Sequence, residues 1–166
     1  MNETLRGQLL VAAPVLSDPN FHRTVVLIAE HGEEGAMGLV LNRPTETSVG
    51  DAVPELSSIA GELEPVFVGG PVSTGSVLAV AELDDPDDAS ELLFGAVGFV
   101  QEPDVPVVRG RVFVGYAGWS AGQLESELEE ESWLVLPAEA SVQGRIRRQG
   151  GPYALLSLMP PDPSLN

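Results

Sequence analysis

The chain contains no cysteine and no lysine. Without cysteine it can form no disulfide, no thiolate nucleophile and no cysteine-ligated metal site. Its 25 acidic residues outnumber 8 arginines, which gives a formal net charge of −17. Nucleic-acid backbones and anionic lipid surfaces are bound mainly through clustered lysine and arginine. The composition therefore argues against direct nucleic-acid binding and against membrane docking.

Long apolar runs are also missing. No stretch approaches the roughly 20 apolar residues of a membrane span. The run at 9–16 is short, is interrupted by Pro14 and follows one arginine and one glutamate, which does not resemble a signal peptide. We therefore expect a cytoplasmic protein. A length of 166 residues with 43% hydrophobic content suits one domain, and 18 glycines and 14 prolines favour short elements and many turns.

Short β-prone runs separated by turn residues predict a mainly β chain. The expected strands are 7–13, 25–30, 37–41, 66–68, 76–83, 111–116, 133–136 and 153–159. Helices are expected from Thr47 or Ser48 toward Ile59, from Ser120 toward Glu131, and over 140–149. The apolar segment 92–100 fits either a strand or a helix. We take 1–166 as one domain with a loose tail at 160–166.

The stretch 111–133 is the most informative part of the chain. A strand runs into a turn marked by glycine, and Ser120 with Gln123 three residues later forms a capping box. Trp119 and Leu124 have the spacing of a hydrophobic staple around the same helix start. The glutamates of this helix are predicted to form its solvent-exposed face: Glu125, Glu127, Glu129, Glu130 and Glu131.

The same stretch also spells G-x-S-x-G, the pattern of a hydrolase nucleophile elbow. Both histidines, His22 and His31, precede Ser120, whereas that fold places its histidine after the serine. The chain is also short for such a hydrolase, and Ser120 already has a sufficient role as a helix cap. We therefore assign no catalytic residue, keep a Ser120 hydrolase as a third hypothesis, and favour a non-enzymatic protein.

Metal and cofactor sites find little support in the sequence. The histidines lie nine residues apart on different elements, and a catalytic zinc usually needs three protein ligands. We expect a hairpin histidine at His31, no metal and no cofactor. Arg145, Arg147 and Arg148 form the one basic cluster. They either complement a helix carboxyl end or hold a small anion, and both readings stay open.

Four blocks of sequence resemble the YqgE/AlgH family of small bacterial proteins. They are the segment from GQLLVAAP to GLVLNRP, the block FVGGPV, the block GYAGWSAGQLESELEEESW, and the closing RRQGGPYALLSLMPPDPSLN. The chain departs from its branch of the family at Val142, where relatives often carry tryptophan, and at Ser120, where members commonly carry other residues. Some members carry a transcriptional-regulator label, but no DNA-binding motif is carried over to this chain.

The resemblance implies a single-domain α+β fold with a curved, mostly antiparallel or barrel-like sheet flanked by a few helices. It also identifies the positions at which the family motifs cluster, which we take as candidate ligand-binding residues. These are Phe21, Arg23, Asn42, Pro44, Gly69, Gly70, Pro71, Gly118, Trp119, Gln123 and Glu127.

Our leading hypothesis is a domain that binds an unknown small molecule or peptide. Trp119 and Phe21 would wall the site, and Arg23, Asn42 and Gln123 would supply polar groups, because loops at strand ends concentrate binding residues. In the alternative, the motifs specify turns and core, and function lies at a protein–protein surface whose acidity selects basic partners. A regulatory role would then be indirect. The oligomeric state stays open.

Overall fold

The protein is described by a computed structural model that covers residues 4–14 and 21–137. Four predictions lie outside the described residues: the helix over 140–149, the strand over 153–159, the basic cluster Arg145, Arg147 and Arg148, and the loose tail. Within the described residues, no helix has the length and apolar character needed to span a bilayer.

Ten strands form the main body of the described chain. They are β1 (Gln8–Ala12), β2 (Val25–Gly32), β3 (Gly35–Val40), β4 (Pro44–Ser48), β5 (Pro65–Val68), β6 (Val72–Leu83), β7 (Glu91–Phe94), β8 (Val97–Val100), β9 (Val107–Ser120) and β10 (Trp133–Pro137). The helices are α1 (Val49–Ala52), α2 (Ser57–Ala60) and α3 (Gln123–Glu129), and two 3₁₀ turns cover Pro54–Leu56 and Pro86–Asp88.

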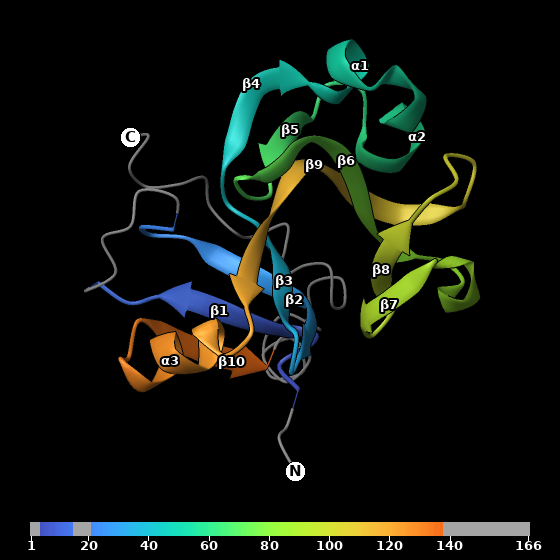
Figure 1. Ribbon diagram of the computed structural model, residues 1–166. Helices are drawn as coiled ribbons and strands as arrows, with labels where there is room; N and C mark the ends of the chain where they lie inside the picture. Colours follow the sequence, from blue (N-terminus) through green and yellow to red (C-terminus); the bar gives the residue numbers. More distant parts are fainter. Residues whose placement is uncertain (1–3, 15–20, 138–166) are drawn as a thin grey trace.

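The sheet curves around β9, which is its longest strand. The strand order is β10-β1-β2-β3-β9-β6-β8-β7, and β5 joins β9 in parallel and β4 in antiparallel fashion. Figure 1 shows β9 passing from the β6–β8 side of the molecule down to α3, with α1 and α2 at one end and α3 at the other. These findings confirm the expected α+β fold with a curved, mostly antiparallel sheet.

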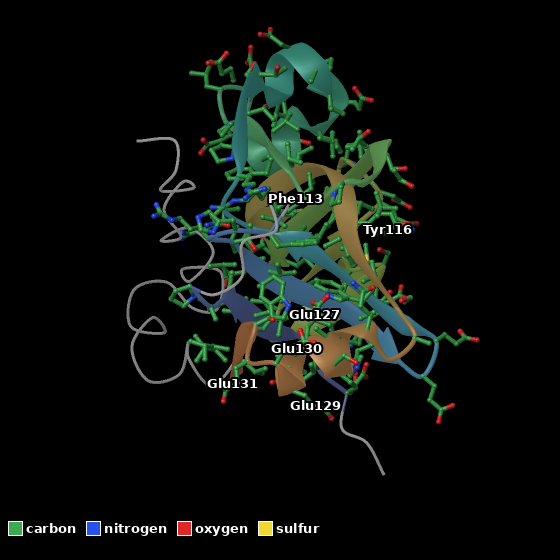
Figure 2. The ribbon with its side chains drawn as sticks, turned by 60° about the vertical axis from the view of Figure 1, so that its left-hand side comes forward. Phe113, Tyr116, Glu127, Glu129, Glu130 and Glu131 are labelled. Carbon is green, nitrogen blue, oxygen red and sulfur yellow. The ribbon has the colours of Figure 1, made fainter. Side chains whose placement is uncertain are left out.

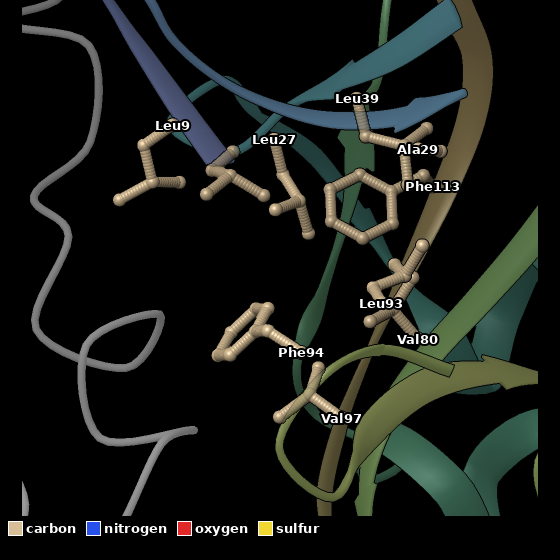
Figure 3. Packing of buried hydrophobic residues seen from close by; sticks show 10 residues of the cluster. Leu9, Leu27, Ala29, Leu39, Val80, Leu93, Phe94, Val97 and Phe113 are labelled. Carbon is tan, nitrogen blue, oxygen red and sulfur yellow. The ribbon is translucent and has the colours of Figure 1, made fainter. Parts of the chain in front are cut away.

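The largest hydrophobic cluster of the described residues lies where β1, β2, β3 and β9 meet the β7–β8 hairpin. Phe113 of β9 is fully buried there between Leu27 of β2 and Leu39 of β3, and Phe94 and Val97 approach from the β7–β8 hairpin (Figure 3). A second cluster includes Leu124 of α3 and lies between this helix and the strands. β9 contributes Phe113 to the first cluster and Ala117 and Trp119 to the second. These positions would share one face of a regular strand, and Gly115, with φ of +72°, lies between them.

Local chemistry explains most of the short elements. The hydroxyl of Ser48 accepts a hydrogen bond from the Asp51 amide at 3.2 Å, which confirms the predicted helix cap. The ambiguous segment 92–100 is a β-hairpin that turns at Gly95, where φ is +53°. A glycine tolerates that backbone conformation without steric cost, which favours the hairpin over a helix.

The chain crosses the backbone of β9 where Gly70 links β5 to β6. A Cβ atom on Gly70 would lie 2.1 Å from the carbonyl carbon of Tyr116, and one on Gly115 would lie 2.4 Å from the carbonyl oxygen of Gly70. Gly115 also has φ of +72°. Both positions therefore require glycine, because any side chain would separate two backbones that pack directly together.

Candidate functional site

Three aromatic rings pack together where β9 meets α3. The rings of Phe21 and Trp119 stack with centroids 5.8 Å apart, and Trp133 meets Trp119 edge to face at 6.1 Å. Trp119 is only 5% exposed and Trp133 only 3% exposed. The predicted contact between Phe21 and Trp119 is present, but the buried rings face one another and form a packed corner.

Glu127 lies at the centre of this corner. Its Oε1 atom accepts hydrogen bonds from the indole N–H groups of Trp119 and Trp133, each at 2.9 Å, and its Oε2 accepts one from Gln123 Nε2 at 3.0 Å. Figure 2 shows Glu127 nearer the strands than Glu129, Glu130 and Glu131. Our expectation that Glu127 belongs to the exposed face was wrong. Buried indole N–H groups need an acceptor, and α3 supplies it.

The capping box at Ser120 is only half formed. Gln123 Oε1 accepts from the Ser120 amide at 3.0 Å, as predicted, but it also accepts from the Ser120 hydroxyl at 3.2 Å. The helix is instead preceded by Gly122, which has φ of +78° and makes no side-chain cap. The hydroxyl of Ser120 is thus bonded to an amide oxygen, which gives the hydrolase hypothesis no support.

His31 is held by two groups near the β2–β3 hairpin. Its Nδ1 accepts from the Leu5 amide at 2.9 Å, so its Nε2 is the nitrogen that donates to Glu125 Oε2 at 2.7 Å. This hydrogen bond lowers the pKa of the Glu125 carboxyl. His31 therefore ties the N-terminal segment to α3, in agreement with a structural histidine near the hairpin.

Arg23 and Asn42 form a tight junction between two chain segments. Arg23 has φ of +60°, and its carbonyl accepts from Asn42 Nδ2 at 3.0 Å. The Asn42 Oδ1 atom accepts from the Val25 amide at 3.0 Å, and Asn42 is only 3% exposed. Asn42 thus fastens the turn that carries Phe21 to the end of β3, a role that uses both ends of its amide.

The remaining candidates also have structural partners. Pro44 begins β4 opposite Phe67, and the segment from Gly69 to Pro71 makes the crossing over β9. The candidates therefore divide between the aromatic corner, the Asn42 junction and the crossing. Of the whole set, Gly118 and Trp119 line one hollow of the surface and Pro44 lines another.

The hollow beside Gly118 is part of a groove that we call the glutamate groove. It consists of two adjoining hollows, of about 1030 and 600 Å³, that share Glu30 and Met37. Its glutamates are Glu30, Glu33, Glu34, Glu55 and Glu91, and its apolar side chains include Met37, Val72, Val77, Tyr116 and Phe99. No arginine of the described residues lines either hollow.

Sequence reasoning missed most of this groove. The acidic hairpin at 31–35 was visible, but we interpreted it only as a turn. Its partners come from β6, β8 and β9, which lie far along the chain from the hairpin. One feature of the sequence could have indicated the groove. Val72 and Val77 flank the polar segment 73–76, and valines in an exposed stretch indicate a surface that a partner can cover. Val72 is 37% exposed and Val77 is 41% exposed.

A third hollow, of about 760 Å³, lies between α2 and the first half of β9. Arg111 lines it with its guanidinium carbon 4.4 Å from the centre of the Phe67 ring, and its Nη1 donates to the carbonyl of Leu41 at 3.0 Å. Arg109 lies two residues earlier on the same strand. The hollow has the size of small-molecule sites, and its charge is mixed because Glu64 also lines it.

The neighbouring Glu82 has an unusual environment. It lies opposite Arg109 in the sheet register, and its Oε1 atom is buried without a hydrogen-bond partner among the described residues. Burial raises the pKa of the Glu82 carboxyl, the charge of Arg109 lowers it, and the charge of Asp84 raises it further. Burial is the largest of these effects.

Comparison with known proteins gives consistent matches along nearly the whole chain. Residues 9–149 match the family described as AlgH-like. The chain is 44% identical to a UPF0301 protein of Streptomyces coelicolor, covering 98% of this chain and 96% of that protein. It is 40% identical to a UPF0301 protein of Mycobacterium leprae, with coverages of 96% and 90%.

Two solved structures share the fold. The crystal structure of a protein from Corynebacterium diphtheriae has a TM-score of 0.75 and 32% identity, and covers 94% of this chain and 93% of its own. The solution structure of the AlgH protein from Pseudomonas aeruginosa has a TM-score of 0.65 and 28% identity, with coverages of 95% and 97%.

Proposed function

Since this chain belongs to the AlgH-like family, we propose that it acts as a non-enzymatic protein-interaction domain whose glutamate groove binds a basic segment of a partner protein. One observation carries the proposal: carboxylates and exposed apolar side chains line the same groove, and among the described residues no arginine lines either hollow. This is the second of the two binding hypotheses that the sequence left open.

The apolar part of the groove supplies contact area. Val72 and Val77 are more than a third exposed, and Met37, Tyr116 and Phe99 are half-buried beside them. Apolar patches rimmed by polar groups are characteristic of interaction sites. A partner that covers these side chains removes apolar surface from water, which favours association.

The charge of the groove selects the partner. Glu33 and Glu34 are exposed at the tip of the β2–β3 hairpin, and Glu30 and Glu55 lie along the groove. The fifth glutamate, Glu91, forms an ion pair with Arg6 at 2.8 Å. The whole chain carries a net charge of −17. The groove and the chain therefore attract a basic segment and repel an acidic one.

The aromatic corner is a weaker candidate than the groove. Trp119, Gln123 and Glu127 satisfy one another's hydrogen bonds, and Asn42 is buried in its own junction. A ligand would have to displace these contacts before it could form its own. Folding contacts are a sufficient role for these family-motif residues, and a regulatory role would act through a protein partner.

The proposal is tested with an acetylated peptide of alternating valine and lysine, labelled for fluorescence anisotropy, and a control peptide with glutamate in place of lysine. The lysine peptide should bind, and the glutamate peptide should not. Charge reversal at the hairpin, Glu33→Lys with Glu34→Lys, should weaken binding at least tenfold.

The matched control is Glu129→Lys with Glu130→Lys, which makes the same change of net charge on the exposed end of α3. This variant should bind the lysine peptide within about threefold of the unmodified protein. If both double variants weaken binding equally, net charge alone attracts the peptide and the groove is not the site.

A further inference from the structure

We propose that the partner segment binds as an extended strand added to the edge of β9 beside Gly118, with a lysine or arginine lying across Gly118 toward Glu30. This inference rests on the proposed function of the glutamate groove and adds the conformation of the partner and its point of contact. Three observations carry it: the pairing of β9, the surroundings of Gly118, and the row of side chains across β2, β3 and β9.

The last residues of β9 have a strand partner on one side only among the described strands. β3 pairs with residues 117–120 of β9, whereas the pairing of β6 with β9 ends at Tyr116 opposite Val72. The strand edge beyond Tyr116 adjoins the groove, which both Val72 and Gly118 line. An unpaired strand edge is a template for an extended peptide, whose backbone continues the sheet.

Gly118 is a glycine that the fold itself does not require. A Cβ atom there would meet its nearest neighbours, Val72 Cγ2 and Tyr116 Cε2, at 3.7 and 3.9 Å, which are ordinary contacts. Its φ is not positive, unlike those of Gly70 and Gly115. Gly118 is nevertheless an exposed residue within β9, and glycine within a strand lowers stability. Its effect is to leave a notch in the groove wall.

The notch lies in line with a methionine and a glutamate. Glu30 pairs with Met37 across β2 and β3, and Met37 pairs with Gly118 across β3 and β9. Strands lie about 4.8 Å apart, so a residue added opposite Gly118 lies roughly 14 Å from the backbone of Glu30. A lysine or arginine and a glutamate can meet end to end over that span, and the apolar stem covers Met37.

The charge of the chain favours a foreign basic strand over a second copy of itself. Two copies joined at this edge would bring together Glu30, Glu33 and Glu34 from each chain, and each copy carries a net charge of −17. Like charges brought together across an interface oppose association. We therefore assign the edge to a segment in which basic and apolar residues alternate.

Methylation of peptide backbone nitrogens tests the strand directly. Two derivatives of the valine–lysine peptide are compared. One is N-methylated at the amides of its valines, and the other at the amides of its lysines. Because successive amides of a strand point to opposite sides, each alternating set faces one side only. One derivative should therefore lose about tenfold or more in affinity, and the other should bind within about twofold of the unmodified peptide.

Substitution at Gly118 tests the notch. Gly118→Val should weaken the peptide about tenfold while leaving the protein folded, because valine suits an exposed strand position. Thr47→Val is the control, since it places a valine at an exposed position of β4 that lines neither hollow of the groove. Glu30→Gln should weaken a lysine peptide but not one with norleucine at the same positions.

The outcomes separate the two proposals. If the unmodified peptide binds but both methylated derivatives bind equally well and Gly118→Val has no effect, strand addition is wrong and the groove proposal stands. If the unmodified peptide does not bind at all, both proposals are wrong. A concentration-dependent dimer that Gly118→Val abolishes would assign the edge to self-association and overturn the assignment to a basic partner.

Discussion

Trp119 and Trp133 share one hydrogen-bond acceptor, because the indole N–H of each donates to Oε1 of Glu127 at 2.9 Å. Trp119 lies near the end of β9 and Trp133 begins β10, so a single carboxylate on α3 joins the strands before and after the helix. The two tryptophans of the chain thus have a common structural purpose.

Truncating Glu127 should destabilise the protein strongly. Glu127→Ala leaves two buried indole N–H groups without an acceptor, which costs about 2–4 kcal/mol in the free energy of unfolding. Glu127→Gln retains one carbonyl oxygen and should cost about 1 kcal/mol. Urea unfolding followed by tryptophan fluorescence measures both. A loss below about 0.5 kcal/mol for the alanine variant would show that the corner is not held by this carboxylate.

Two glycines should respond in opposite ways to alanine. Gly70→Ala places a methyl group against the backbone of Tyr116 and should cost at least about 3 kcal/mol or prevent folding. Gly118→Ala meets only ordinary contacts and should leave stability unchanged or raise it by about 0.5 kcal/mol. Thermal unfolding of the two variants compares them. Equal losses in the free energy of unfolding would contradict the conclusion that the fold requires glycine at position 70 but not at position 118.

The bond between His31 and Glu125 should make stability depend on pH in the acid range. The pKa of Glu125 is lowered in the folded protein, chiefly by the His31 hydrogen bond, so folding favours its charged form. Its contribution is present above the ordinary carboxyl pKa of about 4.5 and is lost as pH falls through the lowered value.

Glu125→Gln should therefore lower stability at pH 6 and have a smaller effect at pH 3. The side chain is 50% exposed, so the loss at pH 6 should stay below about 1 kcal/mol. Urea unfolding at the two pH values measures the difference. A loss of the same size at both would mean that the charge of Glu125 is not responsible.

Glu82 should show the opposite pH dependence. Its pKa is raised by burial, so the folded protein holds the proton more firmly than the unfolded chain. Stability is then lost as pH rises from about 4.5 through the raised value, and the charged form is unfavourable at neutral pH. Glu82→Gln should be more stable than the unmodified protein at pH 7 and equal to it near pH 3.5.

The stability of Glu82→Gln depends on two opposing effects on the Glu82 carboxylate, its burial and the charge of Arg109. Arg109 lies opposite Glu82 and favours the charged carboxylate, whereas burial disfavours it. Chemical denaturation of Glu82→Gln at pH 7 decides between them. A variant less stable than the unmodified protein would show that the attraction of Arg109 outweighs the burial of Glu82.

Local features of the fold could be predicted from sequence because their causes are local. The apolar run before Pro14 predicted β1, and the glycine of the hairpin at 31–35 predicted the β2–β3 turn. Ser48 predicted the cap of α1. The segment 92–100 stayed ambiguous because a short apolar run suits either a strand or a buried helix. Its outcome depends on β6, which pairs with β8.

The candidate site could not be predicted because it depends on long-range pairing. The sequence pattern placed Glu127 on the exposed face of the predicted helix, and only the fold brings Trp119 and Trp133 to its carboxylate. The groove likewise joins the β2–β3 hairpin to β6, β8 and β9. Most of the family-motif residues make contacts within the fold, Gly118 being the exception, and the groove lies mostly outside them.

The most direct test of the groove is an NMR titration of the isotopically labelled protein with the valine–lysine peptide. The account predicts that backbone shifts change for residues 30–37, 72–77 and 116–118, while the indole N–H signals of Trp119 and Trp133 stay in place. Changes centred on those indole signals and on residues 21–23, with the hairpin unaffected, would contradict it and return the binding site to the aromatic corner.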